Sequence, residues 1–443
     1  MKIKGFYRTL FTIAIPITLQ NMLQTFINML DTIMIGRLGA VEIAAVGLGN
    51  QVFFLQTMIL FGITSGGSVF IAQYWGKNDR EGIKRSLGIM LFLSLTVSTL
   101  FTIACLAVPE FIISCYSPDP AVIKVGAEYL RVVCLSYIVT AISSAFVLAF
   151  RSTEHVKLPL FTTACSLVIN LTFNYVFIFV FKWGVKGAAL ATVISRVVEV
   201  LIILGWSYAK KYEACGKLRE YFSFDRSFVA RFVKIALPVM INESLWGLGI
   251  SVQNSIFAHA GTDAITAYNI TSTISQLTWV FFIGLGNGIG VIIGKFIGAG
   301  EQEKARMYAK RSVWFMPTMG LCIGSLLLPL SKLLPFFFNV SPDIISSAAK
   351  MLFVLMLCYP FNASNMNWVV GICRSGGDTI FAAVAEIICL WCISIPLGAC
   401  AAFVWKLEPV FIYACLQTEQ VIKTFIGDTR VLSGKWLHDV TKK

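Results

Sequence analysis

The tetrapeptide Ile13-Ala14-Ile15-Pro16 recurs as Ile235-Ala236-Leu237-Pro238, and the two prolines are 222 positions apart. After one residue of slip, Phe150-Arg151-Ser152 aligns with Cys373-Arg374-Ser375. Self-similarity at a fixed offset is typical of a fold built from two copies of one unit. The offset of 222 also relates Gly39 to Gly261, Ile43 to Ile265, Ala45 to Ala267, Gly62 to Gly284, Gly66 to Gly288, Gly76 to Gly298 and Glu81 to Glu303.

The composition places both copies in a membrane. Hydrophobic residues make up 57% of the chain and charged residues only 13%, which is far from the usage of soluble domains. A helix needs about 20 mostly apolar residues to cross a bilayer. Such runs occupy residues 10–35, 43–74, 86–108, 126–150, 158–181, 187–208, 232–258, 264–297, 313–334, 346–373, 379–404 and 409–432. We therefore expect an all-α membrane protein with twelve transmembrane helices in two parallel six-helix repeats.

The basic residues predict how the chain is oriented, because lysine and arginine accumulate in cytoplasmic loops. We expect a multi-pass protein of the plasma (inner) membrane with both termini in the cytoplasm. This topology and anionic lipid headgroups account for the net charge of +13, so no nucleic-acid partner is expected. The basic connections carry Lys2, Lys4 and Arg8; Lys77, Arg80, Lys84 and Arg85; Arg151 and Lys157; Lys210, Lys211, Lys217, Arg219 and Arg226; Lys304, Arg306, Lys310 and Arg311; Arg374; and Arg430, Lys435, Lys442 and Lys443.

The repeat predicts two lobes joined by a connector. We expect an amino lobe at residues 1–209, a basic amphipathic cytoplasmic connector at 210–230, in the form of a short helix, and a carboxy lobe at 231–443. Six-helix bundles of this kind enclose a site at their interface near the bilayer midplane and alternate its access by rocking. We expect the protein to act as a monomer in contact with membrane lipid.

Patterns for an enzyme, a metal site or a cofactor are weak or absent. Cys389-Leu390-Trp391-Cys392 lies within an apolar run without a second cysteine pair, and His155, His259 and His438 are scattered, so no metal site is expected. The glycine series 284–290 lies inside a span and favours close helix packing, not a phosphate loop. With no nucleotide or protease motif, we expect no enzyme and no cofactor. A transporter of this composition would be driven by a gradient of H+ or Na+.

Asp31 is the first residue that argues for such coupling. Inserting an aspartate at the centre of a spanning helix costs about 2.5 to 3.5 kcal/mol of free energy. Such a residue is therefore expected only where it has a hydrogen-bonding or charged partner, or where it has a function. Burial of a carboxyl group raises its pKa in general and brings protonation into the physiological range. No opposite charge lies three or four positions from Asp31. A polar stripe at helical spacing leads towards it instead, formed by Gln20, Asn21, Gln24 and Asn28.

The second copy carries its own intramembrane acids. Glu243 follows Pro238 by five residues and aligns with Asn21, and Glu386 has no opposite charge nearby in its helix. We expect Glu243 to take part in ion coupling and Glu386 in substrate binding. Two other acids are expected to form ion pairs within one helix, Glu199 with Arg196 and Glu128 with Arg131.

A surface of acids, amides and aromatic rings would favour organic cations. Cation–π attraction contributes about 0.5 to 2 kcal/mol per ring without demanding one ligand shape. Trp246 lies one turn after Glu243, on the same face of the helix, and Trp279 belongs to the eighth expected helix. The expected substrate-binding residues are Gln20, Gln24, Asn28, Trp246, Trp279 and Glu386.

These motifs together resemble the multidrug and toxic compound extrusion (MATE) family over essentially the whole chain. The resemblance rests on Asp31-Thr-Ile-Met-Ile-Gly-Arg-Leu-Gly, on Phe150-Arg-Ser with Pro159 and Asn170 downstream, on Gly184-Val-Lys-Gly-Ala-Ala-Leu-Ala-Thr, on Leu237-Pro with Glu243, and on Arg374-Ser-Gly-Gly-Asp-Thr. It implies twelve helices in two lobes and export of mostly cationic organic compounds by antiport with H+ or Na+.

The resemblance also implies roles for individual residues. Asp31 matches the acid of the family's first helix, Asn170 and Asn174 match polar positions of its fifth, and Glu243 matches an acid that some branches use on the seventh. The chain departs from the family at two places. Branches with an amino-lobe ion site have an aspartate where this chain has Asn174, and branches with a carboxy-lobe site have an acid on the tenth helix, where residues 358–367 offer only Asn362, Asn365 and Asn367.

Three functions follow as hypotheses. The first is a cation-coupled exporter of amphipathic cations that works by alternating access. The second is a flippase for a lipid-linked or polysaccharide substrate, for which a cationic cavity is expected and which Arg131 and Arg196 keep open. The third, an intramembrane enzyme, lacks the motifs that its chemistry would need.

Overall fold

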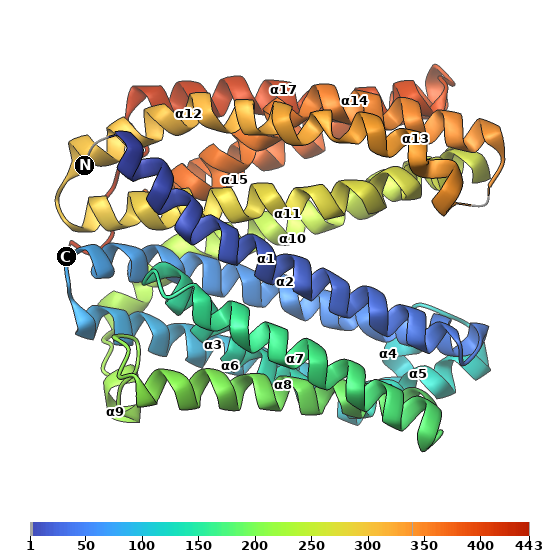
Figure 1. Ribbon diagram of the computed structural model, residues 1–443, viewed down its shortest axis with the longest axis horizontal. Coiled ribbons are helices and arrows are strands. Elements are labelled where there is room, and N and C mark those ends of the chain that lie inside the picture. The colour runs from blue at the N-terminus through green and yellow to red at the C-terminus, as the bar shows by residue number, and fades with distance from the viewer. Residues whose placement is uncertain (1–2, 339, 443) are drawn as a thin grey trace. The chain divides into compact units, whose positions relative to one another are not determined.

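The computed structural model describes residues 3–338 and 340–442, so Lys2 and Lys443 of the expected charge pattern lie outside the described residues. Within these ranges every regular element is a helix (Figure 1). Contacts divide the chain into two compact units, unit 2 with Leu19–Met240 and unit 1 with Met1–Thr18 and Ile241–Lys443. The lobe boundaries expected from the sequence stay a prediction.

The helices follow the apolar runs. The first part of the chain forms α1 (Ile3–Gly36), α2 (Ala40–Gly76), α3 (Arg80–Ala107), α4 (Pro109–Ser114), α5 (Pro120–Val133), α6 (Leu135–Ser152), α7 (Lys157–Tyr175), the π-helical η1 (Val176–Val180), α8 (Gly184–Ala209) and α9 (Leu218–Tyr221). The second part forms α10 (Arg226–Ala260), α11 (Thr262–Gly298), α12 (Gln302–Ser325), α13 (Leu327–Phe337), α14 (Pro342–Met366), η2 (Asn367–Arg374), α15 (Thr379–Ile388), η3 (Cys389–Ser394), α16 (Ile395–Ala399), η4 (Cys400–Val404) and α17 (Pro409–Ser433).

Eleven helices within the described ranges are long and apolar enough to cross a membrane. The twelfth expected span is α17, which has 25 residues and is therefore long enough. It carries four charged residues, Glu419, Lys423, Asp428 and Arg430, and this explains why its apolarity is lower. Three of them have oppositely charged neighbours inside unit 1, because Lys423 lies 3.5 Å from Glu419 and Arg430 lies 2.8 Å from Asp378.

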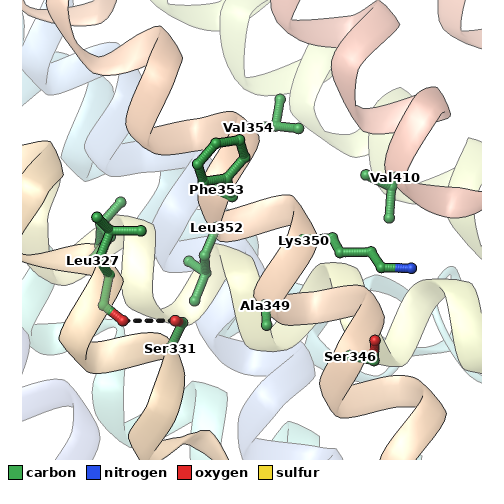
Figure 2. A pocket seen from close by; sticks show the side chains of 10 residues that line it. Leu327, Ser331, Ser346, Ala349, Lys350, Leu352, Phe353, Val354 and Val410 are labelled. Carbon is green, nitrogen blue, oxygen red and sulfur yellow. Dashed lines mark hydrogen bonds between the residues drawn. The ribbon is translucent and has the colours of Figure 1, made fainter.

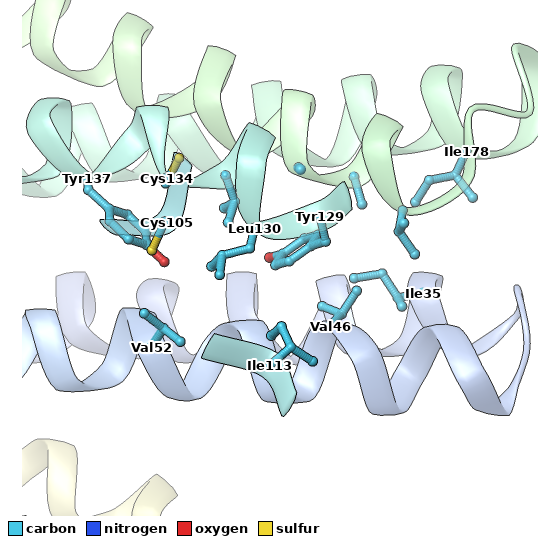
Figure 3. Packing of buried hydrophobic residues seen from close by; sticks show 14 residues of the cluster. Ile35, Val46, Val52, Cys105, Ile113, Tyr129, Leu130, Cys134, Tyr137 and Ile178 are labelled. Carbon is cyan, nitrogen blue, oxygen red and sulfur yellow. The ribbon is translucent and has the colours of Figure 1, made fainter. Parts of the chain in front are cut away.

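Unit 2 is held together by an apolar cluster around the last turn of α1 (Figure 3). Ile35 packs there with Val46 of α2, Tyr129 and Leu130 of α5 and Ile178 of η1, and each of these side chains is at most 5% exposed. The Tyr129 hydroxyl donates to Asn50 Oδ1 at 3.2 Å. Ile35 lies one turn after Asp31, so this cluster fixes the end of the helix that carries the candidate carboxylate.

Glycines bring helices into close contact at equivalent places in the two units. A Cβ atom on Gly66 of α2 would lie 2.6 Å from Ala236 Cα of α10, and one on Gly62 would lie 2.5 Å from Met240 Cγ. In unit 1, a Cβ atom on Gly284 of α11 would collide with Thr18 Oγ1 of α1. The expected close helix packing around the glycine series is therefore confirmed, and both copies use it.

We expect Gly66→Ala to destabilise the protein by about 1–3 kcal/mol, because the added methyl group overlaps with backbone atoms of α10. The matched control is Gly47→Ala in the same helix, where a Cβ atom meets nothing within 4 Å. Thermal unfolding of the purified protein in detergent would measure both variants. Equal midpoints for the two variants would contradict the close approach.

The predicted connector has less helix than the sequence suggests. Its helical part is the four-residue α9, and α10 already begins at Arg226. Tyr221 is 4% exposed, and its hydroxyl donates to the Ala214 carbonyl at 3.1 Å and accepts from the Gly216 amide at 2.9 Å. Lys84 of α3 binds Glu220 at 2.9 Å. Hydrogen bonds to this one tyrosine hold the non-helical part of the connector, and the ion pair between Lys84 and Glu220 docks it on α3.

Candidate functional site

Asp31 is bound to the fifth span by a chain of amides. Asn174 of α7 donates its Nδ2 to Asp31 Oδ1 at 2.6 Å and to Asn170 Oδ1 at 3.0 Å. Both asparagines are only 1% exposed. Asn174 Oδ1 is buried and has no hydrogen-bond partner among the described residues. The structure thus brings together the three amino-lobe residues expected to couple an ion, and it leaves one oxygen atom beside them free to accept a bond.

The middle of the polar stripe on α1 contacts the sixth span. Gln24 donates to Asn28 Oδ1 at 3.5 Å and accepts from Arg196 Nη1 of α8 at 3.3 Å. Arg196 also binds Glu199 at 2.9 Å, which confirms the ion pair expected within that helix. The Arg196 guanidinium interacts electrostatically with the Asp31 carboxylate. Asn28 is exposed in the described structure.

The start of the stripe holds a buried arginine that sequence reasoning did not single out. Arg151, at the end of α6, donates to Gln20 Oε1 at 2.7 Å and to Asn21 Oδ1 at 3.1 Å. Gln20 in turn donates to Thr163 Oγ1 of α7 at 3.1 Å. Both partners of Arg151 are neutral amides, although the arginine itself is only 8% exposed. The sequence signals for Arg151 were its alignment with Arg374 and its place in the Phe150-Arg151-Ser152 string, and it was counted among the basic residues of the cytoplasmic connections.

Unit 1 repeats this arrangement with charged groups. Arg374 of η2 donates to Glu243 Oε1 of α10 at 2.7 Å. The equivalent bond in unit 2 is the one that Arg151 donates to Asn21. Asn242 of α10 donates to Glu386 Oε2 of α15 at 2.6 Å. The equivalent bond in unit 2 is the one that Gln20 donates to Thr163. The repeat therefore conserves the positions of two interhelical hydrogen bonds and exchanges two neutral acceptors for carboxylates.

Glu386 belongs to a larger network that reaches α17. Lys423 Nζ lies 3.9 Å from Glu386 Oε1 and 3.5 Å from Glu419 Oε1. Gln420 donates to Glu419 Oε1 at 2.9 Å and accepts from Asn365 of α14 at 2.8 Å. Sequence reasoning recognised Glu386 but not the two charged residues of the last helix that surround it.

The expected aromatic residues are half-buried and lie outside these networks. Trp279 packs edge-on against Phe282, with ring centroids 5.9 Å apart. Trp246 lies on α10, three residues after Glu243.

A cavity of about 470 Å³ in unit 1 lies between α13, α14 and the first turn of α17 (Figure 2). Its lining is mainly apolar and includes Lys350 but no expected site residue, so it does not extend the site.

One expected ion pair is wrong. Arg131 does not bind Glu128 but lies 2.6 Å from Glu110 of α4, and Glu128 lies 3.5 Å from Lys186 of α8. The spacing of three residues allowed the pair, but α4 and α8 both pack against α5 and offer the two side chains other partners.

Comparison with known proteins agrees with this geometry. The MatE family profile matches residues 16–176 and 238–400, so its two copies begin at the prolines of the repeated tetrapeptide. The chain belongs to the MatE family. This confirms the resemblance seen in the sequence, and it makes the protein a transporter and not an enzyme.

Relatives of this MatE protein cover nearly its whole length. The probable multidrug resistance protein YoeA of Bacillus subtilis is 24% identical over 91% of this chain and 88% of its own. The probable multidrug resistance protein NorM of Thermotoga maritima is 23% identical over 97% of this chain and 93% of its own. An outward-facing multidrug resistance MATE transporter shares the fold with a TM-score of 0.88, at 19% identity over 98% of this chain and 96% of that one.

These matches confirm the expected fold class for the MatE protein, which is all-α and membrane-spanning with twelve helices in two repeats. They do not test the roles of the individual site residues. The ion-coupling roles of Asp31, Asn170, Asn174 and Glu243 therefore stay predictions. The substrate-binding roles also stay predictions, for Gln20, Gln24, Asn28, Trp246, Trp279 and Glu386.

Proposed function

We propose that this MatE protein is an antiporter that exports amphipathic, mostly cationic organic compounds in exchange for H+ or Na+ by alternating access. It works as a monomer in the plasma (inner) membrane, with both termini in the cytoplasm. The family supports multidrug efflux in general, and the names of the relatives support small organic substrates.

The observation that carries the coupling is the Asp31 carboxylate. It lies in a spanning helix, and Asn174 holds one of its oxygen atoms at 2.6 Å. A carboxylate inside a spanning helix is energetically costly, and such residues are usually functional. The Asn174 amide that donates to it also presents a buried Oδ1 without a partner among the described residues. Carboxylate and amide oxygens bind hard cations such as Na+, and the carboxylate alone is sufficient for H+.

The preference for cationic substrates rests on charge and on the aromatic rings. Glu386 and Glu243 in unit 1 are each about 15% exposed at their side chains, so neither is sealed off completely. Trp246 is half-buried one turn from Glu243 and could attract an organic cation through its ring face. These groups set a preference for positive charge without defining one shape.

Transport into membrane vesicles would test the proposal. Inside-out vesicles expose the cytoplasmic face, so they should accumulate a permanently charged fluorescent dye when the lumen holds the higher concentration of the coupling cation. H+ and Na+ gradients imposed separately would identify the ion, and a neutral hydrophobic dye would test the preference for charge. Vesicles without the protein serve as the control.

Each part of the proposal can fail independently in this experiment. Accumulation that neither gradient increases would overturn the coupling. Equal transport of the charged and the neutral dye would overturn the substrate preference.

Arg151 gives one reason to keep the flippase as a second candidate. It is a buried cation whose partners are both neutral amides, and a buried positive charge could attract a lipid-linked phosphate. Translocation of a fluorescent lipid pyrophosphate in the same vesicles, with no transport of the cationic dye, would favour it.

A further inference from the structure

The network at Glu386 in unit 1 contains more negative than positive charge. Two carboxylates, Glu386 of α15 and Glu419 of α17, share a single ammonium group, Lys423. The side chains of Glu419 and Lys423 are 7% and 3% exposed, and that of Glu386 is 15% exposed. If all three groups were ionised, this buried cluster would carry one uncompensated negative charge, which is strongly unfavourable away from water.

The neighbouring charged groups do not supply the missing positive charge. Glu243 and Arg374 lie close by and neutralise each other. Among the described residues, Cys389 of η3 is the other titratable group in electrostatic contact with Lys423, and ionisation would make it negative. Further along α17, Asp428 is bound to Ser364 of α14 and Arg430 to Asp378. The excess acid must therefore be neutralised within the cluster itself.

Two buried oxygen atoms of the network are left without partners. Glu419 is 5% exposed, and its Oε2 has no hydrogen-bond partner in the described part of the chain. Asn242 is 4% exposed and donates to Glu386 from its amide nitrogen, while its Oδ1 is likewise unsatisfied among those residues. Buried polar atoms in native proteins nearly always have a partner, so these two point to a bound species.

The positions of the other oxygens indicate where that species binds. Both oxygens of Glu386 face donors, Asn242 Nδ2 at 2.6 Å and Lys423 Nζ at 3.9 Å. Glu419 Oε1 also faces donors, Gln420 and Lys423, whereas its Oε2 faces none among the described residues. A metal cation is disfavoured because the ammonium group of Lys423 already lies between the two acids and would repel it.

We propose that Glu419 carries one proton on Oε2, while Lys423 is left to compensate Glu386, so that unit 1 holds a second proton-binding site. The inference rests on the proposed function only for its role, since in an antiporter such a site would allow one more proton to be exchanged. The site differs from the one at Asp31 because it lies in unit 1, is built from other residues and includes a lysine, Lys423.

Infrared spectroscopy of the purified protein tests the site without substrate or gradient. The carbonyl band of protonated carboxyl groups at neutral pH should lose the area of one carboxyl group in Glu419→Gln. Glu386→Gln should cause the same loss, because Glu419 then ionises as the only partner of Lys423. Lys423→Met should raise the band by a similar area, because both acids are then protonated. Glu303→Gln is the matched control, since its side chain is 89% exposed and should not contribute.

Loss of the band in both glutamine variants with a gain in Lys423→Met supports the proton on Glu419. A band that is unchanged in either glutamine variant, or that does not rise in Lys423→Met, overturns it. The result is independent of the proposed coupling at Asp31, which is judged by efflux and not by the spectrum.

Discussion

Asp31→Asn is expected to abolish cation-coupled efflux and leave a protein that still inserts in the membrane. The asparagine keeps the shape of the side chain and an oxygen that can accept the bond from Asn174. It can neither lose a proton nor compensate a cation, so the gradient no longer drives transport. Efflux of a cationic dye should fall to the level of cells without the protein.

The control for this change is Asp263→Asn, which makes the same substitution at an exposed position in the first turn of α11. It should leave efflux unchanged. Undiminished efflux by Asp31→Asn at saturating substrate would remove Asp31 from the coupling mechanism. Glu243→Gln should also impair transport, and if only the Asp31 variant does so, coupling resides in the first copy.

Arg374→Met is expected to destabilise the protein by about 3–5 kcal/mol, because it leaves the Glu243 carboxylate buried without the cation 2.7 Å away. The repeat provides a matched control. Arg151→Met removes the equivalent arginine, but it leaves behind the neutral amides of Gln20 and Asn21. Its cost should therefore be clearly smaller, and thermal unfolding in detergent would measure the difference.

The double variant of Arg374→Met with Glu243→Gln should recover part of the loss, because it removes the unpaired charge. Glu243→Gln alone should be well tolerated structurally, since it recreates the arginine and amide pair that unit 2 already contains. Equal destabilisation by Arg374→Met and Arg151→Met would show that the charge of Glu243 does not decide the outcome.

The sequence by itself determined the class of the protein, its spans and its twofold repeat. Apolar runs of spanning length can be recognised without any tertiary contact, because the bilayer imposes the same length on each helix. The repeat could be recognised because copies of one unit keep glycine and proline at the same backbone positions. Gly62 and Gly284 are such a pair, and in both units a helix passes at the distance that only glycine allows.

Only the tertiary structure decided the partners of the polar side chains. Asp31 with Asn174, Glu243 with Arg374 and Glu386 with Lys423 each join different helices. Arg131 shows the limit most clearly, because its spacing to Glu128 permitted a pair and a neighbouring helix supplied Glu110 instead. Helical periodicity predicts which residues share a face of a helix. The rotation of each helix and the helices packed against it decide which groups contact that face.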